Sequence, residues 1–163
     1  MTLDFLSPSR CAPETTASPL RRALEGSGHV VDLSLDGKLE LRGELARVGP
    51  LAGEELVRLS PRRGFLLTPH DPVEAVERVR AQGVLAYDAT GGWAGFALEG
   101  ETLMRRLTDL DLDRLPAAGP FARVTAIVLR DDGDRFRVYV PQELAHDVAL
   151  AALDAARGLE ANA

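Results

Sequence analysis

The chain has 163 residues, a mass of 17.5 kDa and a formal net charge of −6. This length favours a single domain, and a composition of 45% hydrophobic and 27% charged residues argues against a disordered or collagen-like chain. The acidic balance disfavours nucleic acid as a partner, and the single cysteine, Cys11, excludes an internal disulfide framework. No segment has the ~18 consecutive apolar residues of a membrane span or the apolar centre of a secretory signal, so we expect a cytoplasmic protein without a membrane partner.

The chain divides into an arm, a domain and a tail. Residues 1–17 are rich in Pro, Ser and Thr, which predicts a flexible N-terminal arm. A single domain is expected over residues 18–158 and a C-terminal tail over 159–163. The domain begins with a short helix, because Ser18 is a suitable N-cap, Pro19 a suitable first helical residue and Gly26 a suitable terminator.

The pattern of the first half predicts two hairpins and a helix. Asp36-Gly37 is a typical two-residue turn between alternating strands, and residues 60–64 have the composition of a second turn. The helix carries an apolar stripe on Val73, Val76 and Val79. The expected elements are strands over residues 29–33, 38–42, 55–59 and 65–68 and a helix from 70 that ends at Gly83.

The second half repeats this order with one insertion. Gly91-Gly92 predicts a turn between two strands, and residues 131–134 predict another. Leu103, Met104 and Leu107 mark an inserted short helix. The expected elements are strands over residues 84–89, 93–98, 121–129 and 136–140 and a closing helix over 142–157 that stops at Gly158.

The two halves also share a local pattern. Asp32-Leu33-Ser34 and Asp88-Ala89-Thr90 each give an Asp, an apolar residue and a hydroxyl, followed by a Gly-containing turn, a strand and a glycine. Because hairpins dominate over long crossovers, we expect antiparallel sheets with helices packed on one side. The predicted class is α+β, with two similar halves of antiparallel hairpins that are each closed by a helix.

One cluster contains the residue types of a hydrolytic triad. His29, Asp32 and Ser34 lie within six residues of one another. Side chains on a strand and its following turn diverge, however, whereas a triad needs mutual hydrogen-bond reach. We therefore interpret Asp32 and Ser34 as residues that cap the predicted hairpin and assign no catalytic residue.

Metal binding is also disfavoured by spacing. Asp109, Asp111 and Asp113 alternate with leucines, which is typical of a solvated edge beside a buried one. Residues 131–134 lack the downstream carboxylate of a calcium loop. The three histidines, at positions 29, 70 and 146, have no second ligand at metal-binding spacing.

Two arginine pairs and one tryptophan are the remaining ligand candidates. Arg62-Arg63 and Arg105-Arg106 could each hold an anion, although a solvated turn or helix face is the preferred interpretation. Trp93 is the only tryptophan, and core packing is its preferred role, with a ligand platform as the alternative. Lys38 is the only lysine among many arginines, which we attribute to GC-rich codon usage.

Several short segments resemble one known superfamily. They are Asp88-Ala89-Thr90-Gly91-Gly92-Trp93, Leu98-Glu99-Gly100, Leu103-Met104 and residues 107–112. Together they resemble the first domain of aminomethyltransferase (glycine cleavage T-protein) and of YgfZ-type folate-binding proteins. Ser18-Pro19-Leu20, the strand around Arg58-Leu59-Ser60-Pro61 with Phe65-Leu66-Leu67, and the arginine-bearing hairpin and helix over 129–156 are most similar to the gamma subunit of heterotetrameric sarcosine oxidase.

The departures from this superfamily argue against catalysis by the chain alone. Where aminomethyltransferases carry a Gly-Gly turn and an acidic pair, this chain has Arg123-Val124-Thr125-Ala126, so the acid that would assist folate chemistry has no counterpart. The cysteine of the YgfZ signature is absent, because Cys11 lies in the arm. The length also leaves no room for the second domain that completes the folate site.

The resemblance implies two functional hypotheses. The first is a non-catalytic accessory or scaffold subunit in one-carbon metabolism, with larger flavoprotein subunits or self-association as its partners. The second is a stand-alone module for a flat anionic ligand such as tetrahydrofolate, held by Trp93, Arg105 or Arg123. No other cofactor is assigned, and a true aminomethyltransferase is a distant third.

Overall fold

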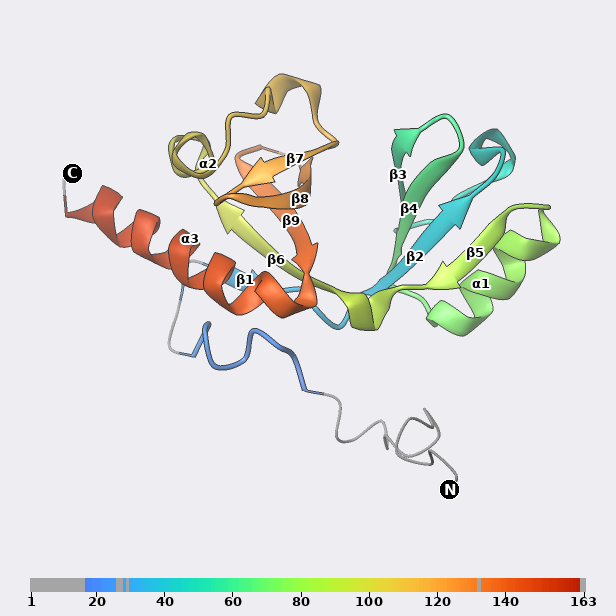
Figure 1. The fold of residues 1–163 in the computed structure, drawn as a ribbon, viewed down its shortest axis with the longest axis horizontal. Coiled ribbons are helices and arrows are strands. Elements are labelled where there is room, and N and C mark those ends of the chain that lie inside the picture. The colour runs from blue at the N-terminus through green and yellow to red at the C-terminus, as the bar shows by residue number, and fades with distance from the viewer. Residues whose placement is uncertain (1–16, 26–27, 29, 132, 162–163) are drawn as a thin grey trace.

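The computed structural model describes residues 17–25, 28, 30–131 and 133–161. These residues form two antiparallel sheets and three helices (Figure 1). The predicted arm, apart from its last residue, lies outside the described residues, so the arm remains a prediction. In the described part of the chain, no helix is both long and apolar enough to cross a membrane.

The strands are divided between a five-stranded sheet A and a four-stranded sheet B. Sheet A has the order β1 (Val30–Asp32), β6 (Trp93–Glu99), β9 (Arg135–Pro141), β8 (Val124–Arg130) and β7 (Ala117–Phe121). Sheet B has the order β3 (Glu55–Ser60), β4 (Arg63–Thr68), β2 (Gly37–Arg42) and β5 (Leu85–Asp88). The helices are α1 (Pro72–Ala81), α2 (Glu101–Leu107) and α3 (Ala145–Glu160).

The two halves exchange their first strands. β1 pairs with β6 in sheet A, while β2, the next strand along the chain, pairs with β4 and β5 in sheet B. Likewise, β5 pairs with β2 in sheet B, while β6, the next strand along the chain, pairs with β9 in sheet A. The hairpins predicted at Asp36-Gly37 and Gly91-Gly92 are therefore wrong: both segments are crossovers between sheets, because pairing with distant strands outweighs the local turn preference.

The crossovers have matching hydrogen bonds. Asp32 Oδ1 accepts from Ser34 N and Asp88 Oδ1 accepts from Thr90 N, both at 2.9 Å. Ser34 Oγ then accepts from Gly95 N at 3.3 Å, and Thr90 Oγ1 accepts from Lys38 N at 3.0 Å. Asp32 and Ser34 therefore cap a turn as predicted, but the turn belongs to a crossover between the sheets and not to the predicted hairpin. The halves are related by an approximate two-fold symmetry.

Other elements are confirmed or corrected by the structure. The hairpin β3–β4, the hairpin β8–β9 and helix α1 form as predicted; Asp71 caps α1 by accepting from Val73 N at 2.9 Å. The helix predicted after Ser18 is a series of turns. The strand predicted over 121–129 begins only at Val124, as β8, after a turn at Ala122-Arg123, and the strand β7 before that turn was not predicted. Helix α3 continues through Gly158.

The layers follow from the alternation of side chains along the strands. One core cluster lies between sheet A and helices α2 and α3, and a second lies between sheet B and α1. A third joins the two sheets face to face, with Phe65 and Leu67 of sheet B against Ile127, Leu129 and Tyr139 of sheet A. The helices thus lie on the outer faces of two packed sheets.

Candidate functional site

The structure brings two of the candidate residues into one cavity. Arg105, at the carboxyl end of α2, and Arg123, in the turn between β7 and β8, line a cavity of about 300 Å³. Arg106, Thr108 and Asp109 line it as well. We call this the arginine cavity.

Arg123 reaches the cavity through an unfavourable backbone conformation. Ala122 and Arg123 have φ values of 46° and 70°, in the left-handed region that non-glycine residues rarely adopt. Such positions typically cost about 1–3 kcal/mol and are concentrated at functional sites. Ala122 N donates to Leu107 O at 2.7 Å, and this bond holds the turn against the end of α2.

The arginine cavity is only partly neutralised. Arg105 is paired with Glu101, with Nη2 2.7 Å from Oε1, and this hydrogen bond lowers the pKa of Glu101. Among the described residues, Arg106 and Arg123 have no ion-pair partner. Asp109 contributes one negative charge at the rim. The guanidinium groups of Arg106 and Arg123 can therefore hold a small anion between them.

Trp93 does not join this cavity. It begins β6, whereas α2 follows the other end of that strand (Figure 1). Its ring packs edge-on against Phe65, with centroids 5.1 Å apart and an interplanar angle of 69°. Trp93 is half-buried and packs against the cluster between the sheets. This position agrees with a role in core packing.

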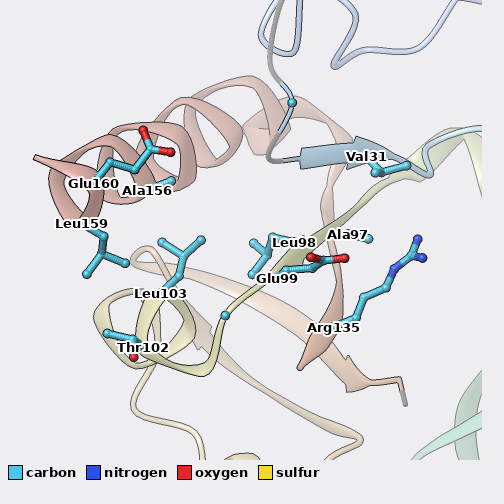
Figure 2. Close-up of a pocket in the computed structure, with 12 residues that line it drawn as sticks. Val31, Ala97, Leu98, Glu99, Thr102, Leu103, Arg135, Ala156, Leu159 and Glu160 are labelled. Atoms are coloured by element: carbon cyan, nitrogen blue, oxygen red, sulfur yellow. The ribbon is translucent and has the colours of Figure 1, made fainter. Parts of the chain in front are cut away.

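A second cavity of about 300 Å³ lies at the end of sheet A between α2 and α3 (Figure 2). Leu103 and Leu159 give it apolar walls, and Glu99 and Arg135, which are opposite one another in the β6–β9 register, line it too. Gly28 also lines it, and the neighbouring residues 26, 27 and 29 are outside the described part of the chain. We therefore assign no ligand to this cavity.

A charged cluster at the rim between the sheets was not found from the sequence. Arg137 on β9 forms an ion pair with Glu55 on β3 and donates from Nε to Asp131 Oδ1 at 2.7 Å. Burial opposes the charge of Arg137, but these two carboxylates outweigh it, so the pKa of Arg137 is raised. The alternation of Arg135 and Arg137 along the strand was the available signal.

Lys38 has a structural position that the sequence analysis did not assign. Its side chain is 1% exposed, and Nζ donates to Leu33 O, Ser34 O and Asp36 O at 3.3, 3.0 and 2.5 Å. Burial lowers the pKa of Lys38 to about 8. The ammonium group thus ties together the crossover that follows β1.

The acidic motifs have local structural roles. Asp111 Oδ1 accepts from Asp113 N at 3.2 Å, and Asp134 Oδ1 accepts from Glu101 N at 2.8 Å. Within the described ranges, no group of three or more His, Cys, Asp or Glu side chains is placed to hold a metal ion.

Comparison with known proteins gives structural similarity at low sequence identity. No protein-family model and no curated protein matches the sequence. A chain of the heterotetrameric sarcosine oxidase from Corynebacterium sp. U-96, solved with pyrrole 2-carboxylate, is similar with a TM-score of 0.73 and 15% identity, over 86% of this chain and 94% of that chain. The glycine cleavage system aminomethyltransferase T from Bartonella henselae is similar with a TM-score of 0.54 and 16% identity, over 83% of this chain and 48% of that chain.

These matches test the resemblance seen in the sequence. This chain spans about half the length of the aminomethyltransferase but nearly all of the sarcosine oxidase chain. At these identities the similarity concerns the fold. The predicted resemblance is confirmed at that level: the chain has the fold shared by a chain of heterotetrameric sarcosine oxidase and by part of aminomethyltransferase T.

Proposed function

We propose that the chain is a non-catalytic accessory subunit of a multi-subunit oxidoreductase related to sarcosine oxidase, acting in one-carbon metabolism. The observation that carries this proposal is the match over 94% of a chain that belongs to a heterotetrameric enzyme. The gamma-type resemblance of the sequence supports the same role. Larger flavoprotein subunits are the proposed partners, and the cytoplasm is the proposed compartment.

The chemistry of the described residues supports a structural role. Asp32 and Ser34 are occupied by backbone groups of the crossovers, and the Lys38 ammonium is occupied by three carbonyl oxygens. These three groups are thus engaged in maintaining the fold. A fold of this kind can supply a rigid surface to subunits that carry the reaction.

Purification from the native host tests the proposal. A chromosomally tagged copy should co-purify with larger subunits that show flavin absorbance, in constant ratio through size-exclusion chromatography. The same tag on an unrelated cytoplasmic protein is the control. A protein that elutes alone as a monomer, with no flavin, would contradict the proposal.

A second candidate function is supported by the arginine cavity. Because Arg105 and Arg123 line the same cavity, a flat anionic ligand of the tetrahydrofolate type could be held there without help from Trp93. Titration calorimetry with tetrahydrofolate should then give a signal that Arg123→Ala removes and that Arg62→Ala, in the turn between β3 and β4, retains. No heat at high ligand concentration would exclude this function.

A further inference from the structure

The end of sheet B farthest from the crossovers presents an ordered row of side chains. Arg63 pairs in register with Ser60 and with Arg42, and Arg42 pairs with Leu85. These residues come from all four strands, and Arg42, Arg63 and Leu85 share one face by the alternation of side chains. In the adjacent row on the same face, Tyr87 lies opposite Glu40.

Only part of this face is covered by sheet A. Val57 and Phe65, on β3 and β4, are buried in the cluster between the sheets. On β5, Leu85 and Tyr87 are 58% and 47% exposed. The face of sheet B that packs against sheet A at β3 and β4 is therefore exposed to solvent at β5. We call Glu40, Arg42, Arg63, Leu85 and Tyr87 the arginine–tyrosine surface.

The arginine–tyrosine surface has an excess of positive charge. Glu40 Oε1 is 3.0 Å from Arg42 Nη2 and 3.0 Å from Arg63 Nε, so one carboxylate serves two guanidinium groups. The surface therefore carries two arginines and one glutamate, a net charge of +1 in a chain of net charge −6. The shared carboxylate holds the two arginines side by side. Within the described part of the chain their other donors have no partner, so these donors can bind an anion.

The edge of the sheet at this point is already occupied. Arg80 Nε donates to Ala86 O on β5 at 3.0 Å, and its guanidinium lies 5.8 Å from the centroid of the Tyr87 ring. This contact disfavours the addition of a partner strand to β5. A partner should therefore dock on the face of the sheet.

The chemistry of the surface defines its partner. Tyr and Arg are enriched at the centres of protein interfaces, and the paired guanidinium groups match carboxylates. The net charge of the whole chain disfavours nucleic acid. We propose that the arginine–tyrosine surface docks an acidic segment of a partner protein. Its carboxylates meet Arg42 and Arg63, and an apolar side chain meets Leu85 and Tyr87; this proposal rests on the proposed role as a subunit.

A defined probe tests the surface directly. A fluorescein-labelled oligoglutamate peptide ending in leucine should bind the purified protein at low salt by fluorescence anisotropy, and an oligoglutamine peptide of the same length should not. The double variant Arg42→Gln, Arg63→Gln should weaken binding by about tenfold or more. The matched control, Arg114→Gln with Arg157→Gln, removes two exposed arginines that belong to neither candidate site and should change binding less than about twofold.

The outcomes separate this proposal from the proposed function. Equal binding by the wild type and the Arg42, Arg63 variant, or an equal loss in the control, overturns the docking surface. Tighter binding of a short oligothymidylate than of oligoglutamate also overturns it in favour of nucleic acid. Circular dichroism of each variant confirms folding before binding is compared.

Co-purification provides the second readout. If host subunits accompany the wild type but not the Arg42, Arg63 variant, the docking surface is supported in the complex. If they accompany both equally, the docking surface is refuted and the subunit role stands. If no subunit accompanies the wild type, the subunit role fails, and the peptide measurement alone decides whether the surface binds acidic segments.

Discussion

Gly95, on β6, has no room for a side chain, because Tyr139 and the backbone of Leu33 lie against it. A Cβ built at this position would lie 2.6 and 2.7 Å from two ring carbons of Tyr139 and 3.2 Å from Leu33 O. The Tyr139 ring is 2% exposed, so it cannot move toward solvent. Leu33 N also donates to Gly95 O at 2.8 Å, so the backbone is fixed as well.

Gly95→Ala is therefore expected to destabilise the fold. Overpacking of a filled core costs about 1–3 kcal/mol, and the upper end applies because both neighbours are held in place. For a domain of this size each kcal/mol lowers Tm by about 2–4 °C. A loss of about 3 kcal/mol thus predicts a decrease in Tm of about 6–12 °C, measured by thermal circular dichroism.

Two further variants make this prediction specific. Gly92→Ala places its Cβ in open space and should leave Tm unchanged or slightly raised. Tyr139→Leu removes the ring, so the double variant with Gly95→Ala should be more stable than the sum of the single effects implies, with a coupling above about 1 kcal/mol. Additive effects, or a Gly95→Ala variant as stable as the wild type, would refute the proposed contact.

Three other outcomes are expected. Arg123→Gly should raise the free energy of unfolding by about 0.5–1 kcal/mol in urea titrations, because glycine accepts the positive φ that Arg123 now adopts. Lys38→Met should lower it by about 1–3 kcal/mol, since the Lys38 ammonium now satisfies three carbonyl oxygens. The pKa of Lys38 is about 8 in the fold against 10.5 for the free side chain. Between pH 8 and 10.5, Lys38 therefore holds its proton in the unfolded chain but loses it in the folded chain. Wild-type stability should therefore rise through this contribution as pH increases from 8 toward 10.5, and the increment should be missing in Lys38→Met, as urea titrations at several pH values would show.

The sequence predicted the elements better than their partners. The local signals of β3, β4, α1 and α3 agree with the structure because each depends on neighbouring residues. The destination of each strand depends on distant pairing: the partners of β1 are 64–68 positions away and those of β5 are 43–49 positions away. Asp36-Gly37 carries the same signal in a hairpin as in a crossover. The repeated Asp, apolar and hydroxyl pattern did identify equivalent turns, which form equivalent hydrogen bonds.

The candidate site was predictable only in part. Arg105 and Arg123 were named from charge, but their meeting in one cavity depends on a turn whose residues, Ala122 and Arg123, lack the glycine or asparagine typical of positive φ. Lys38 was unassigned because lysine is almost always solvated, and its burial follows from the crossover. The basic end of sheet B was visible only as Arg62-Arg63, since Arg42 joins it through strand pairing.

The approximate symmetry of the halves provides an internal control for the arginine–tyrosine surface. The registers of β2 with β4 and of β6 with β9 match position by position, so Glu99 is the counterpart of Arg42 and Arg135 that of Arg63. In sheet A this rung therefore joins opposite charges, whereas in sheet B it joins two arginines. Sheet A forms the same strand pairing with Glu99 opposite Arg135, a pair without net charge. The fold therefore does not need the surplus positive charge of Arg42 and Arg63 in sheet B, beside the exposed Tyr87. Binding of a negatively charged partner would explain why this charge is retained.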